Sequence, residues 1–107
     1  MPRKLVKEVR LNGLPYNTNR DPQFYRRLPG QPFRLLVLLG GEGTATARFE
    51  VDGELRCERQ VSLPGRFECE VRFDAPGTHV GTLVVEGGGQ THRQELRLDV
   101  EAEAWVG

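Results

Sequence analysis

Few side chains in this sequence have the types and spacing that could carry out chemistry. The two cysteines, Cys57 and Cys69, form no CxxC pair, which argues against a zinc site. Ser62 is the only serine, and it lies outside the GxSxG turn that presents a hydrolase nucleophile. The acidic residues alternate with arginine on predicted strand faces, so none is singled out as half of a catalytic pair.

The histidines and the glycine runs are equally uninformative about catalysis. His79 and His92 would lie about 20 Å apart if residues 78–86 and 93–101 form a hairpin, which is too far to share a metal ion. The runs at 40–43 and 87–89 lack the GK[ST] ending of a phosphate-binding loop, so we interpret them as turns. We therefore expect no enzyme, no bound metal and no cofactor.

Two interpretations of the cysteines are open. Both fall on the inward parity of predicted strands, beside Leu55 and Phe67. They could be buried, unpaired thiols that act as small apolar residues, which is the interpretation we favour. They could instead form a disulfide between neighbouring strands, which would argue for an oxidising compartment.

The segment that best defines the architecture is residues 66–74, in which apolar and charged side chains alternate without a fault. This period of two predicts a half-buried strand with Phe67, Cys69, Val71 and Phe73 facing inward. The other segments with strand-like patterns are residues 5–11, 23–28, 33–39, 45–51, 55–61, 78–86 and 93–101. Breaks at 12–22, 40–43, 63–65 and 87–89 separate them, and no segment has a capped helical stripe. The pattern predicts an antiparallel β-sandwich of seven to eight strands.

The Asp52-Gly53 pair predicts a hairpin between residues 45–51 and 55–61. A two-residue loop would place Leu55 and Cys57 on the opposite face from Phe49. We therefore expect a three-residue loop with a glycine bulge, which brings these side chains to one face.

Length and charge restrict the class of protein. The 107 residues suit one domain, in which 1–27 form an edge strand and a long loop, 28–101 the core, and 102–107 a tail. Fifteen basic and fifteen acidic residues are interleaved, so we expect no nucleic-acid partner. No signal-peptide core or long apolar run is present, so we expect no membrane insertion. The chain as written is expected to be cytoplasmic, and an excised domain would be extracytoplasmic.

Two groups of side chains are candidates for an interaction surface. Leu36, Leu38, Val80 and Val84 would point outward from a two-layer sandwich. Aromatic and arginine side chains also cluster around the long loop, and the tail holds the only Trp; this second group is Tyr16, Arg20, Phe24, Tyr25, Arg26 and Trp105. The loop could equally pack its aromatics onto the end of the sandwich.

Three passages in order resemble bacterial immunoglobulin-like or fibronectin type III-like domains. They are residues 29–33, 49–54 and 75–79, each at a turn beside a strand. The chain departs from the antibody pattern because Gly81 stands about where that family has its second cysteine, and His79 where it has a corner tyrosine.

The resemblance implies adhesion, spacing or partner binding. We therefore expect a non-catalytic module that binds another protein or its own copy, as a possible homodimer. An accessory carbohydrate-binding module, with Tyr16, Tyr25 or Trp105 stacked on a sugar, is the alternative.

Overall fold

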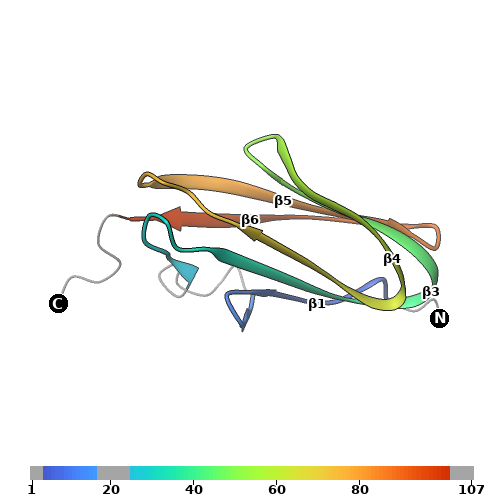
Figure 1. Ribbon diagram of the computed structural model, residues 1–107. Helices are drawn as coiled ribbons and strands as arrows, with labels where there is room; N and C mark the ends of the chain where they lie inside the picture. The colour runs from blue at the N-terminus through green and yellow to red at the C-terminus, as the bar shows by residue number, and fades with distance from the viewer. Residues whose placement is uncertain (1–3, 17–24, 102–107) are drawn as a thin grey trace.

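The computed structural model describes residues 4–16 and 25–101, and these residues form antiparallel β-structure without an α-helix (Figure 1). The prediction of an all-β antiparallel fold is confirmed. The sheet order is β2-β1-β3-β5-β6, and β4 pairs with β3 outside this path. The six strands are β1 (Val6–Leu11), β2 (Leu14–Pro15), β3 (Phe33–Val51), β4 (Glu54–Val71), β5 (Gly77–Gly87) and β6 (Gln90–Val100).

The two longest strands, β3 and β4, each contribute two halves with different neighbours. Residues 33–39 of β3 lie between β1 and the second half of β4. Residues 45–51 of β3 lie between β5 and the first half of β4. The sheet therefore curls back on itself, and both strands bend at the same end of the molecule (Figure 1).

These bends merge four of the predicted segments into two strands. We expected residues 40–43 and 63–65 to end strands, but the ladder between β3 and β4 continues on both sides of each segment. Leu39 pairs with Gly65 and Gly43 with Leu63, so that three residues of β3 lie opposite Pro64 alone. Gly41 and Gly43 have φ of 100° and 89°, which glycine adopts at little cost. The extra residues therefore bend the strand while its pairing resumes beyond them.

Two further predictions from the sequence were wrong. Residues 25–28 of the predicted strand at 23–28 form only an isolated bridge between Arg27 and Val100. The short strand β2 lies in the predicted break at 12–22.

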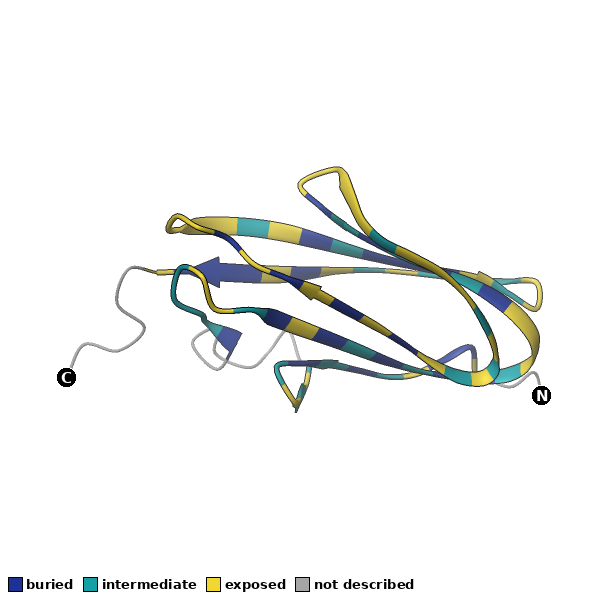
Figure 2. Ribbon diagram, viewed as in Figure 1, coloured by how far each residue is buried: buried dark blue, intermediate teal, exposed yellow. Residues whose placement is uncertain are grey.

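The inward side chains of both halves form one apolar cluster. Burial alternates along the strands as Figure 2 shows, regularly in the second half of β4, where Phe67, Cys69 and Val71 are buried and Glu68 and Glu70 exposed. This confirms the alternation predicted for residues 66–73. Members from all the long strands meet in this cluster, including Leu11, Phe33, Phe49, Phe67, Leu83 and Leu96.

The hairpin between β3 and β4 differs from the predicted one. Val51 pairs directly with Glu54, so the loop has two residues. Asp52 and Gly53 have φ of 52° and 83°, and two positive φ values are typical of the hairpin turn whose twist matches the strands. A register shift follows, with Phe49 opposite Cys57 and Glu50 opposite Leu55. Cys57 therefore shares the face of Phe49 as predicted, but Leu55 points outward and is 50% exposed.

Candidate interaction surface

The outer face of β1, the first half of β3 and the second half of β4 carries a regular pattern of charged and apolar side chains. Directly paired residues of antiparallel strands project their side chains to the same side of the sheet. We call the resulting patch the β1–β3–β4 face. It has two rows of three, Glu8, Leu38 and Arg66 in one row and Arg10, Leu36 and Glu68 in the next.

The leucines at the centre of the β1–β3–β4 face are both half-buried. The flanking charges pair within their own strands. Arg10 Nε lies 3.1 Å from Glu8 Oε1, although without hydrogen-bond geometry. Arg66 Nε lies 3.9 Å from Glu68 Oε1, and both of these side chains are more than 60% exposed, at 68% and 63%. Such exposed pairs stabilise a monomer little, so the charges remain able to meet a partner.

A shallow depression of about 350 Å³ opens on this face between β3 and β4. Leu36 and Glu68 belong both to its lining and to the β1–β3–β4 face. Its complete lining is Arg34, Leu35, Leu36, Glu68, Cys69 and Glu70. The depression is too open and too charged to enclose a small molecule, but it makes this face uneven where a partner would contact it.

The outer face of β5 offers less apolar area than the sequence suggested. Val80 is 43% exposed, but Val84 is only 6% exposed. The cross-strand neighbours of Val84 are Arg48 and Arg93, and Arg48 forms an ion pair of 3.4 Å with Glu86. The aliphatic stems of arginines at such positions cover apolar neighbours. Of the two valines, only Val80 can therefore act as an exposed anchor.

The two tyrosines of the second candidate group are used in internal contacts. Tyr25 is 3% exposed, and its hydroxyl donates a hydrogen bond of 2.6 Å to the Pro15 carbonyl. The Tyr16 ring lies 5.1 Å from that of Tyr25, and the Tyr16 hydroxyl accepts a 3.1 Å hydrogen bond from the Arg97 amide. The loop thus packs its tyrosines onto the sheet, and Tyr25 has no open ring face for a sugar.

The remaining members of that group are scattered or lie outside the described residues. Arg26 forms an ion pair of 3.3 Å with Glu101, near the end of β6. Arg20, Phe24 and Trp105 fall outside residues 4–16 and 25–101. Among the members that the structure describes, Tyr16, Tyr25 and Arg26 form no joint exposed surface, because Tyr25 is buried.

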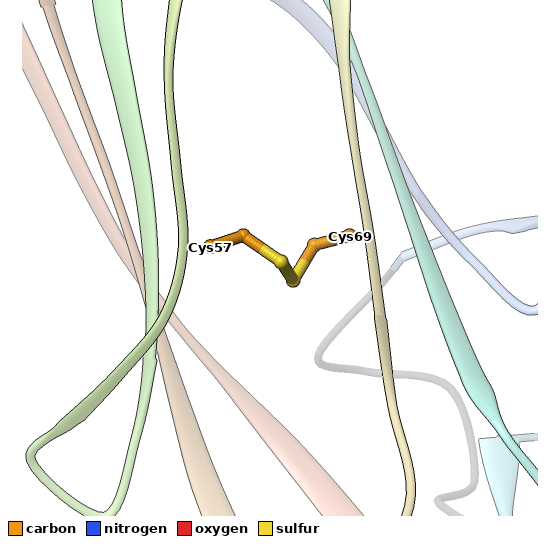
Figure 3. The surroundings of a disulfide bond; sticks show 2 residues. All are labelled: Cys57 and Cys69. Atoms are coloured by element: carbon orange, nitrogen blue, oxygen red, sulfur yellow. A yellow bond between two sulfur atoms is a disulfide. The ribbon is translucent and has the colours of Figure 1, made fainter.

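The cysteines form a disulfide, so the favoured interpretation of two free thiols is wrong. Cys57 lies in the first half of β4 and Cys69 in the second, with Cα atoms 6.0 Å apart (Figure 3). The disulfide links two halves of one strand that folds back, whereas we considered a bond between separate strands. The sequence signal for this disulfide was that both cysteines fall on inward-facing positions of predicted strands. Neither sulfur remains as a nucleophile or a metal ligand.

One cluster that the sequence did not predict lies at the hairpin end, where His79 meets Asp52. His79 Nδ1 lies 2.7 Å from Asp52 Oδ2, and the imidazole stacks on Phe73 with ring centroids 3.9 Å apart. The Val80 amide donates to Asp52 Oδ1, and this bond, followed by that to His79, lowers the pKa of Asp52. The cluster joins the turn to β5, and we assign it a structural role.

The other chemistry-bearing residues are not brought together. His92 contacts Gln94 through Nε2, at 3.0 Å from Oε1. Within the described residues, no three His, Cys, Asp or Glu side chains are grouped as metal ligands. In the same part of the chain, no helix has the length and apolar character needed to traverse a bilayer.

Comparison with known proteins adds no further assignment. No protein-family model matches the chain, and no curated protein matches it significantly.

Proposed function

We propose that this chain is a non-catalytic β-sandwich module of the immunoglobulin-like type, which binds another protein or its own copy through a sheet face. Without the two-residue strand β2, counting the halves of β3 and β4 separately gives seven strand segments in two groups. One group is β1 with residues 33–39 and 65–71, and the other is β5 and β6 with residues 45–51 and 54–63. This grouping of the strand segments supports a sandwich of two layers.

The observation that carries the proposal is the β1–β3–β4 face. Its centre is apolar, because Leu36 and Leu38 occupy outward positions and are only half-buried. Its rim carries both signs of charge, which favours a specific partner over non-specific attraction. Potential reactive groups elsewhere are already engaged, since the cysteines are bonded and Tyr25 is buried.

A photo-crosslinking experiment in cells that express the full chain tests this proposal. A photoreactive phenylalanine analogue would replace Leu38 in one strain and Thr91, on the outer side of β6, in a control strain. We expect a discrete protein adduct from position 38 and none from position 91. Equal adduct patterns at both positions, or no protein adduct at position 38, would contradict the proposal.

A further inference from the structure

We infer that the β1–β3–β4 face pairs with the same face of a second copy of this chain, related by a two-fold axis. This inference rests on the proposed function and names the partner. It follows from the arrangement of the charges, which makes the face complementary to itself.

The charges of the β1–β3–β4 face alternate in both directions. Along β1 the order is Glu8 then Arg10, and along β4 the order at the same two rows is Arg66 then Glu68. Opposite corners of the patch therefore carry the same sign, and adjacent corners carry opposite signs. A face with this pattern meets opposite charges when it is turned over onto its own copy.

Two orientations of the axis satisfy the corner charges, and they differ in what Arg34 meets. Arg34 lies on β3 in line with the leucines and is exposed. An axis along β3 would place Arg34 directly against the Arg34 of the second copy. An axis across β3, between Leu36 and Leu38, would place it against Gly40, which the Lys7 side chain covers. Each orientation thus brings Arg34 near a cation, and the corner charges are satisfied equally in both.

With the axis across β3, Leu36 of one copy packs on Leu38 of the other, twice. Glu8 faces Arg10 of the second copy, and Arg66 faces Glu68. Each ion pair within a strand thereby becomes part of a four-charge cluster, and the cluster excludes water from the leucines at the centre. A two-fold axis makes all these contacts occur in duplicate.

The opposite outer face also alternates in charge along its strands, but each of its rows carries the same sign at both ends, and its centre is weaker. Glu50 and Arg48 alternate along β3, and Glu95 and Arg93 alternate at the same rows of β6. The side chains between them on β5 are Thr82 and Val84, and Val84 is 6% exposed. Charge alone would allow this face to pair, but its centre adds little apolar area. It therefore provides the matched control.

Complementation between two charge variants, followed by sedimentation velocity up to about 1 mM protein, tests the inference. The acidic variant carries Arg10→Glu with Arg66→Glu, and the basic variant carries Glu8→Arg with Glu68→Arg. We expect the wild type to dimerise, each variant to lose dimerisation by at least about tenfold, and an equimolar mixture to regain it as a heterodimer.

The control variants are Arg48→Glu with Arg93→Glu, and Glu50→Arg with Glu95→Arg, which change the net charge equally on the opposite face. They should dimerise like the wild type. A monomeric wild type, undiminished dimers of the acidic and basic variants, failure of their mixture to associate, or loss of dimers in the controls would each overturn the inference. A monomeric wild type that still crosslinks another protein from position 38 would overturn self-pairing and leave the proposed function standing.

Discussion

Reduction of the disulfide should lower stability without destroying the fold, and the size of the effect can be worked out from the structure. Cys57 and Cys69 are separated by 12 residues in sequence. In the oxidised protein the unfolded chain must keep these residues together, which lowers its conformational entropy. For a closed loop of this length the chain-entropy estimate is about 3 kcal/mol in favour of the folded state.

A loss of this size corresponds to a large shift in melting temperature. Unfolding entropy near 60 °C is about 2.1 cal/mol/K per residue, so a chain of this length should lose roughly 13 °C. Urea unfolding should show the same change in the free energy of unfolding, with a larger m-value for the reduced protein because its unfolded state is more expanded. The fold should persist because a large apolar cluster, with Phe33, Phe49 and Phe67 at its centre, remains.

The assay compares oxidised protein, protein reduced with a phosphine, and the double variant Cys57→Ala with Cys69→Ala. The double variant should resemble the reduced protein and should not respond to the reductant. The reasoning would be refuted if oxidised and reduced protein unfolded at the same urea concentration. A thiol count of two in protein purified from an oxidising compartment would refute it as well.

Three other perturbations have definite outcomes. Gly81→Ala should cost about 2 kcal/mol in urea unfolding, because a Cβ at this position would overlap the Phe49 ring. Asp52→Asn should make stability depend less steeply on pH in the acid range, the acid limb of the stability curve. The pKa of Asp52 is lowered in the folded state, so the ionised Asp52 stabilises the fold above its unfolded-state pKa. That contribution is lost as pH falls through the folded-state pKa. Tyr25→Phe should cost about 1 kcal/mol through its lost hydrogen bond to Pro15, and Tyr25→Ala about 4 kcal/mol through the cavity it leaves.

Each of these three perturbations has a control or a contradicting outcome. Thr82→Ala should change the urea midpoint far less than Gly81→Ala, and equal effects would contradict the steric explanation. Thermal melts between pH 2 and 5 (about the range of carboxylate titration) test the Asp52 variant, and an acid limb as steep as that of the wild type would contradict the role of Asp52. Equal losses for the two Tyr25 variants would show that the ring contributes nothing beyond its hydroxyl.

The strands could be predicted from local pattern because each inward or outward choice depends on a period of two. The half-buried strand predicted from residue 66 forms up to Val71, and the run at 33–39, which is apolar except for Arg34, forms where its side chains indicated. What local pattern could not reveal is whether a glycine-rich break ends a strand or bends it. The segment at 40–43 bends β3 because pairing with β4 resumes beyond it, and that depends on residues up to twenty positions away.

The same limitation explains the cysteines and the hairpin. Parity placed Cys57 and Cys69 inward, but their proximity follows from the fold-back of β4. We expected a three-residue loop at Asp52 because it would bring Leu55 and Cys57 to the face of Phe49. That expectation assumed that the extra residue lies in the turn. The chain places the extra residue at Arg56 instead, and Leu55 faces solvent as a result. Outward Leu36 and Leu38 were correctly assigned, since the central position of β3 fixes both of its faces.

The free side of β4 has a consequence for how copies of the chain can meet. Within the described part of the chain, the first half of β4 pairs with β3 only, so one row of its backbone groups faces outward. That edge carries exposed Glu54, Arg56, Glu58 and Arg59, and closely spaced charges oppose the addition of another strand. Addition of another strand at this edge is thereby disfavoured, and so is fibril growth that would start from it.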